Sequence, residues 1–236
     1  MCLIKTFMGI TLCLFASLLQ AATLFGETFC HSDDYMCVTI AKSDTWDSLF
    51  PNEKEQDLVM RLNRMNTALK PGMVIAVPKN LNQLTIYDIA PFPRYIEPMG
   101  EKTIFVNQSQ LAWGAYDAEG QLVWWGPVSS GSGHCAKSDG DCLTPSGSFR
   151  VIRKQDADCI STVFPRRANG ESGGAEMPYC IHFLRGYALH GSTEVPGYRK
   201  SHGCVRMFTE DARWLNEEFV ELPGAGGLKG TPVIIN

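Results

Sequence analysis

The chain has 236 residues, with 21 lysines and arginines against 25 aspartates and glutamates, so its formal charge is −4. Hydrophobic residues make up 44% and charged residues 19%, which excludes a disordered chain, and the mild acidity argues against a nucleic-acid partner. The 13 prolines and 22 glycines indicate many turns and favour a mostly β protein. The length suits one large domain, or a small domain followed by a medium one.

The first 22 residues have the pattern of a secretory signal peptide. Lys5 is their only charge, an apolar run covers residues 10–19, and Ala21 and Ala22 supply small residues for cleavage. The rival interpretation is a membrane anchor, but this needs about 20 apolar residues and the run is short. We therefore expect an exported protein, periplasmic or associated with the cell wall, with no stable membrane insertion once the leader is removed.

Removal of the leader takes away two of the nine cysteines and leaves those at positions 30, 37, 135, 142, 159, 180 and 204. An oxidising compartment favours pairing, and an odd number leaves at least one thiol over. The pairs of near neighbours are 30/37, 135/142 and 159/180, which would leave Cys204 free. A bridge between Cys180 and Cys204 is the alternative that stays open. No Cys-x-x-Cys spacing occurs, so we expect no metal.

Residues 30–80 are expected to form a small unit of their own. Thr45 offers an N-cap for a short helix that begins at Trp46, and Pro71-Gly72 predicts a turn. A second helix ends near Arg64. The expected order is strand, helix, helix, strand, over residues 38–40, 46–50, 53–64 and 73–77.

This order resembles a LysM module, a small binder of wall polymers that contain N-acetylglucosamine. The matching stretches are Asp44-Thr45-Trp46, residues 62–66 and residues 69–78. The resemblance implies that the unit binds the glycan of peptidoglycan. The alternative is a βααβ packing subdomain that binds nothing.

Residues 81–99 contain Pro91, Pro93 and Pro98, and we expect a stiff, extended connector. From residue 100 to 236 the pattern predicts a mostly β domain with one late helix, which Thr209 can cap. The predicted strands cover residues 103–106, 111–116, 122–125, 148–153, 179–183, 187–189 and 231–235.

The stretch Ser201-His202-Gly203-Cys204-Val205-Arg206 carries the most chemical information. It combines the leftover cysteine with a glycine that lets backbone approach closely, and His190 ends a predicted strand upstream. A thiol nucleophile needs a base to become a thiolate at neutral pH, and an imidazole suits this task. Backbone N–H groups at Gly203 and Cys204 would be placed to stabilise an oxyanion.

These residues resemble the L,D-transpeptidase (YkuD) family, whose signature is His-Gly, a spacer, and then Ser-His-Gly-Cys-hydrophobic-Asn/Arg. Thr144-Pro145-Ser146-Gly147 and Met177-Pro178-Tyr179 extend the match, which covers about residues 100–236. The resemblance implies a β-sandwich or barrel and acyl transfer on peptidoglycan stem peptides through a thioester. No cofactor is implied.

The same resemblance implies the roles of single residues. Cys204 would be the nucleophile and His190 its base and later the acid. The backbone of Gly191 or Ser192 would orient the imidazole. The remaining site residues would be His202 and Gly203 at the oxyanion site, Ser201 as their support, Arg206 on a substrate carboxylate, and Met177, Tyr179 and His182 at the substrate.

Three functions compete on this scaffold. A transpeptidase would pass the acyl group to an amine of a second stem peptide or of a wall protein. An L,D-carboxypeptidase would let water resolve the thioester. A non-catalytic surface protein would only bind peptidoglycan. The cysteine and both histidines are present together, which favours an enzyme.

Overall fold

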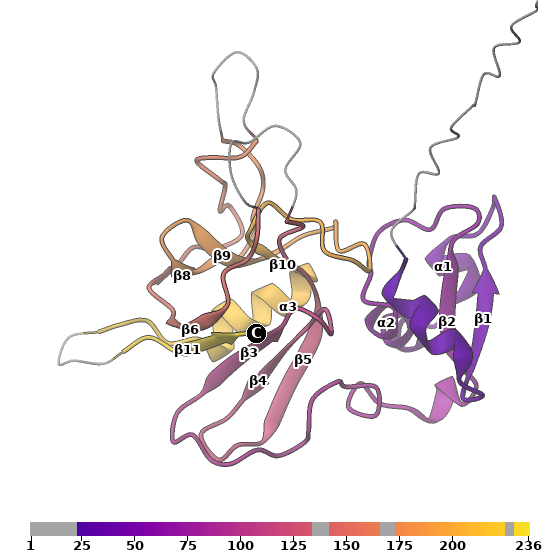
Figure 1. The fold of residues 1–236 in the computed structure, drawn as a ribbon, viewed down its shortest axis with the longest axis horizontal. Helices are drawn as coiled ribbons and strands as arrows, with labels where there is room; N and C mark the ends of the chain where they lie inside the picture. Colours follow the sequence, from indigo (N-terminus) through magenta and orange to yellow (C-terminus); the bar gives the residue numbers. More distant parts are fainter. Residues whose placement is uncertain (1–22, 134–141, 166–172, 225–228) are drawn as a thin grey trace, which may run out of the picture.

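A computed structural model of the chain describes residues 23–133, 142–165, 173–224 and 229–236. Residues 24–83, here called the N-terminal unit, lie beside a larger β-rich domain that begins at residue 103 (Figure 1). The expected leader falls outside the described residues. Within the described ranges, no helix is long and apolar enough to cross a membrane.

The N-terminal unit has the predicted order of strand, helix, helix and strand. Its first helix is capped as expected: the Thr45 hydroxyl accepts from the Ser48 amide at 3.1 Å, and the Ser48 hydroxyl accepts from the Thr45 amide at 2.9 Å. The two strands pair antiparallel around a small apolar core that includes Trp46 and Ile75. The elements are η1 (Phe25–His31), β1 (Tyr35–Thr39), α1 (Trp46–Leu49), α2 (Glu53–Leu62), β2 (Val74–Pro78) and η2 (Leu81–Gln83).

The β-rich domain is one mixed sheet of nine strands in the order β6-β11-β3-β4-β5-β10-β9-β8-β7. The sheet curls until its two ends approach each other. Two contacts show this: the ring centroids of Phe149 and Phe183 lie 5.3 Å apart, and the Ile152 amide donates to the His182 carbonyl. The strands are β3 (Thr103–Asn107), β4 (Ala112–Tyr116), β5 (Leu122–Ser129), β6 (Gly147–Arg150), β7 (Arg153–Lys154), β8 (Ile181–Leu184), β9 (Tyr187–Gly191), β10 (Val205–Met207) and β11 (Pro232–Ile235).

The late helix, α3 (Thr209–Trp214), packs inside the curl and continues as a π-helical turn, η3 (Leu215–Phe219). The predicted cap is corrected by one residue: the N-cap position is Phe208, and no side chain caps the helix there. Thr209 is its first helical residue, because the chain leaves β10 only two residues earlier. The predicted strand over 148–153 is likewise broken into β6 and β7.

The proline-rich connector is not a free spacer, because it packs along β4 and β5. Trp125 donates from Nε1 to the Ile86 carbonyl at 2.6 Å, and the Tyr116 hydroxyl donates to the Pro93 carbonyl at 2.7 Å. Tyr87 and Phe92 complete the apolar cluster around Trp125. The connector therefore belongs to the fold of the β-rich domain.

Two of the predicted disulfides are confirmed, Cys30–Cys37 and Cys159–Cys180. Cys142 is also disulfide-bonded, whereas Cys135 lies outside the described residues. The alternative bridge between Cys180 and Cys204 is excluded in this structure, since Cys204 is the free cysteine of the described chain.

Candidate active site

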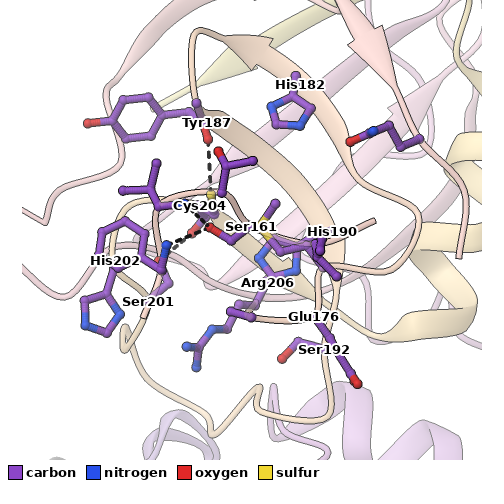
Figure 2. Close-up of a pocket in the computed structure, with 18 of the residues that line it drawn as sticks. Ser161, Glu176, His182, Tyr187, His190, Ser192, Ser201, His202, Cys204 and Arg206 are labelled. Atoms are coloured by element: carbon purple, nitrogen blue, oxygen red, sulfur yellow. Dashed lines mark hydrogen bonds between the residues drawn. The ribbon is translucent and has the colours of Figure 1, made fainter. Parts of the chain in front are cut away.

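Cys204 and His190 are brought together by two neighbouring strands. β9 and β10 run parallel, and Arg206 is registered with His190. The buried residues Val205 and Met207 face the core, so Cys204 and Arg206 face the other side of the sheet with His190 (Figure 2). The cysteine and the imidazole therefore share one wall of a cavity of about 850 Å³.

The His190 imidazole is buried and has a fixed orientation. Its Nδ1 lies 2.9 Å from the Gly191 carbonyl oxygen. A carbonyl can only accept, so Nδ1 carries the hydrogen and Nε2 keeps its lone pair. Burial lowers the pKa of His190 to about 4, and nearby Arg206 lowers the pKa further while the Gly191 carbonyl opposes the shift. At neutral pH this histidine is a neutral base.

The Cys204 thiol is held mainly by backbone. Sγ lies 3.7 Å from the Gly186 carbonyl, and it packs against the apolar cluster around the Cys159–Cys180 disulfide. Burial raises the pKa of the Cys204 thiol, while a bond from the Ala188 amide and the charge of Arg206 oppose this shift. At neutral pH the cavity thus holds a neutral thiol and a neutral imidazole, so ionisation of the sulfur requires a proton acceptor.

The turn before Cys204 depends on glycine at position 203. Gly203 has a φ of +118°, and a Cβ there would lie 2.8 Å from Cε1 of Tyr187. Ser201 is buried and fixes the turn, because its hydroxyl accepts from the Gly203 amide at 3.1 Å and donates to the Cys204 carbonyl. The Thr144 hydroxyl donates to the Gly203 carbonyl at 2.7 Å. Ser201 therefore holds the backbone of the turn that precedes Cys204.

Two arginines lie at different places in the cavity wall. Arg206 donates to the Glu194 carboxylate at 3.0 Å, and its side chain is 18% exposed. Arg153 lies 3.2 Å from Nδ1 of His182. Burial, followed by the charge of Arg153, lowers the pKa of His182 to about 4. His182 is therefore a neutral acceptor for Arg153, and both residues line the cavity.

The other predicted site residues divide into two groups. Met177, Ser192 and His182 line the cavity. Tyr179 does not line it; its side chain packs against the main core. His202 also lines the cavity, where its imidazole packs on the Phe164 ring at 5.0 Å and points away from Cys204 (Figure 2).

One group of potential metal ligands occurs in the described chain. Donor atoms of Cys159, Cys180 and His182 lie within 4.8 Å of one another. Both sulfurs are bonded to each other in the disulfide, which leaves a single imidazole. The group does not fit a metal while the disulfide is intact.

Several residues of the site were not found in the sequence. Glu194 and Arg153 are charged residues in loops or on a two-residue strand, and only their partners in space reveal them. Phe164 and Glu176 lie between Cys159 and Cys180, in a segment that the disulfide closes into a loop. They line the side of the cavity that is here called the outer wall. The cysteine spacing was the one sequence signal that marked this loop.

Comparison with known proteins agrees with this geometry. Residues 101–235 match the family model of YkuD, the L,D-transpeptidase catalytic domain, and the chain belongs to this family. The probable L,D-transpeptidase YbiS of Escherichia coli K12 is 24% identical over 159 residues, which cover 66% of this chain and 48% of YbiS. The chain thus spans about half the length of the curated relatives it matches.

A solved structure supports the same fold. The L,D-transpeptidase of Xylanimonas cellulosilytica, residues 123–326, superposes with a TM-score of 0.51 and 22% identity. The match covers 75% of this chain and 78% of that one. The curled, mostly β domain with few helices is therefore the fold of an L,D-transpeptidase. The resemblance of the N-terminal unit to LysM stays a prediction.

Proposed function

We propose that this protein is a cysteine-dependent L,D-transpeptidase that acts on the stem peptides of peptidoglycan. The observation that carries the proposal is the pairing of a free thiol with a neutral imidazole in one cavity of a YkuD domain. The fixed tautomer of His190 leaves Nε2 as the proton acceptor that a buried thiol requires.

In the first half-reaction, Sγ of Cys204 attacks the carbonyl carbon of the third stem residue, and its proton passes to Nε2 of His190. The imidazolium then gives this proton to the nitrogen of the departing terminal D-alanine, and a thioester remains on the cysteine. We assign the oxyanion donor to the Cys204 amide, because the Gly203 amide is bonded to Ser201 in the resting structure.

In the second half-reaction, an amine attacks the thioester and loses a proton to the same imidazole. The amine belongs to a second stem peptide or to a wall protein, and the product is a cross-link or an attached protein. Arg206 would hold a carboxylate of the substrate, although Glu194 must then share or release it. Export to the periplasm or wall and binding of glycan by the N-terminal unit complete the proposal.

The test is incubation of the purified protein with tetrapeptide muropeptides and mass spectrometry of the products. We expect a cross-linked dimer, and an acyl adduct on Cys204 with a carbapenem by intact mass. Cys204→Ala should form neither. His190→Ala should slow acylation by about 10²–10⁴-fold. His202→Ala is the matched control, since its imidazole points away from the thiol, and it should lose far less.

The alternatives give different outcomes in the same assay. A tripeptide without any dimer would show an L,D-carboxypeptidase on this scaffold. No product and no adduct would leave a surface protein that binds peptidoglycan without turning it over. Equal activity of the His190→Ala variant and the wild type would refute the assignment of the base.

A further inference from the structure

The N-terminal unit is docked on the β-rich domain through a buried ion pair. Arg61 on α2 donates from Nη1 and Nη2 to both carboxylate oxygens of Asp211 on α3, at 2.9 and 2.8 Å, and its side chain is 5% exposed. Trp124 also donates to this carboxylate at 3.0 Å. A Cβ at Gly126 would lie 2.0 Å from the carboxylate, so a glycine makes room for the pair. These contacts fix the position of the unit on the β-rich domain.

The docked unit is hydrogen-bonded to a loop that borders the active site. This cleft loop, residues 192–197, connects β9 with the turn that carries Cys204. Asn66 of the N-terminal unit donates from Nδ2 to the Ser192 carbonyl at 2.8 Å and accepts from the Val195 amide at 3.0 Å. The Asn66 amide also donates to the Val195 carbonyl at 2.9 Å. The Asn66 side chain thus binds one backbone carbonyl, at Ser192, and one backbone amide, at Val195, of the cleft loop.

The far side of the cleft loop contacts the groups of the proposed mechanism. The Ser192 amide donates to the Met207 carbonyl at 2.9 Å, and the Glu194 side chain accepts from Arg206. The Gly191 carbonyl, which orients His190, lies one peptide before the carbonyl that Asn66 holds. Only two successive peptide units therefore separate the Asn66 side chain from the imidazole.

We propose that Asn66 is a positioning residue for this active site, and that the N-terminal unit forms part of the cleft by holding residues 192–197 against β10. This inference rests on the proposed function of Cys204 and His190. It assigns the unit a task that does not depend on binding glycan. The unit fixes the backbone that orients the base and the loop that carries Glu194.

Replacement of Asn66 by alanine removes two side-chain hydrogen bonds and leaves the Ser192 carbonyl and Val195 amide without these partners. Loss of groups that orient a functional side chain typically costs about 10–100-fold in activity. We expect the rate of Cys204 alkylation by iodoacetamide at pH 7 to fall about 10-fold, because the base is no longer held in place. At a pH high enough to ionise the thiol directly, the rate should equal that of the wild type.

The matched control is Asn52→Ala in the same unit. Asn52 also makes two side-chain hydrogen bonds, to the amides of Lys54 and Glu55 at the start of α2, and both stay inside the unit. This variant should lower Tm but leave the pH profile of alkylation unchanged. Asn66→Asp keeps an acceptor for Val195 and loses the donor to Ser192, so it should fall between the wild type and Asn66→Ala.

Hydrogen–deuterium exchange of residues 192–197 supplies the second measurement. Asn66→Ala should raise exchange in this loop more than Asn52→Ala does. The inference is overturned if the two alanine variants change the alkylation profile equally, or if the loop loosens while the profile at pH 7 stays at the wild-type value. Failure of the wild type on muropeptides would reject the proposed function instead, and the alkylation and exchange results would still decide the role of Asn66.

Discussion

Removal of the Asp211 carboxylate should strongly destabilise the whole protein. The Arg61 side chain is 5% exposed in the wild type. In the Asp211→Ala variant it loses its buried carboxylate and keeps only the partly exposed Asp57 and the Trp125 carbonyl as partners. Breaking a buried, bidentate pair on one side typically costs about 3–5 kcal/mol. For a chain of this size, about 2–4 °C of Tm is lost per kcal/mol, so Tm should fall by roughly 6–20 °C.

Thermal unfolding followed by circular dichroism measures this change. The control is Glu210→Ala, the adjacent residue of α3, whose ion pair with Arg213 is exposed at both ends, so its loss should shift Tm far less. A double variant, Arg61→Met with Asp211→Leu, should recover much of the loss, because neither charge is then buried alone. Equal shifts in Tm for Asp211→Ala and Glu210→Ala would refute the reasoning.

Four further predictions concern the active site. Because the pKa of His190 is about 4, thioester formation should lose activity only as pH falls through about 4, and an acid limb near pH 6.5 in the rate profile would contradict this. The same depressed pKa should make the folded state less stable as pH falls from about 6.5 to 4, because His190 takes up a proton there in the unfolded chain but not in the folded one. The free energy of unfolding should fall by up to about 3 kcal/mol, which urea titrations across that range would measure. Gly203→Ala should abolish acyl-adduct formation, since its Cβ would meet Tyr187; a normal adduct yield by intact mass would disprove this. Selective reduction of the Cys159–Cys180 disulfide should slow acylation, because the outer wall of the cavity is then no longer held in place. Mass spectrometry of the carbapenem adduct measures this rate with and without reductant, and equal rates would contradict the prediction.

Local signals in the sequence were sufficient for much of the site. The motif around Cys204 and the upstream His190 suggest the proposed chemistry by residue type alone, and the structure places both in one cavity. The cap at Thr45 follows from the hydrogen-bonding capacity of its hydroxyl. The pairing of Cys159 with Cys180 follows from proximity along the chain.

Features that depend on distant partners were not predictable. Asp211 has the sequence context of a solvated acid in the first turn of a helix, yet it is buried by an arginine 150 residues away. β10 is only three residues long, too short to show an alternating hydrophobic pattern in the sequence. Its extended conformation is stabilised by pairing with β5 and β9 on either side. The contact of Asn66 with the cleft loop has the same origin, since neither partner is unusual in its own segment.

The packing of the proline-rich connector determines how this chain can be divided. A fragment that starts near residue 100 would lack Tyr87 and Phe92, which pack around Trp125, and would therefore expose an apolar surface to water. It would also strand Asp211 without its guanidinium partner. We expect such a fragment to aggregate on expression, and we expect replacement of the first hundred residues by those of another protein to give a chain that does not fold. We therefore expect the two parts to unfold together as one cooperative unit.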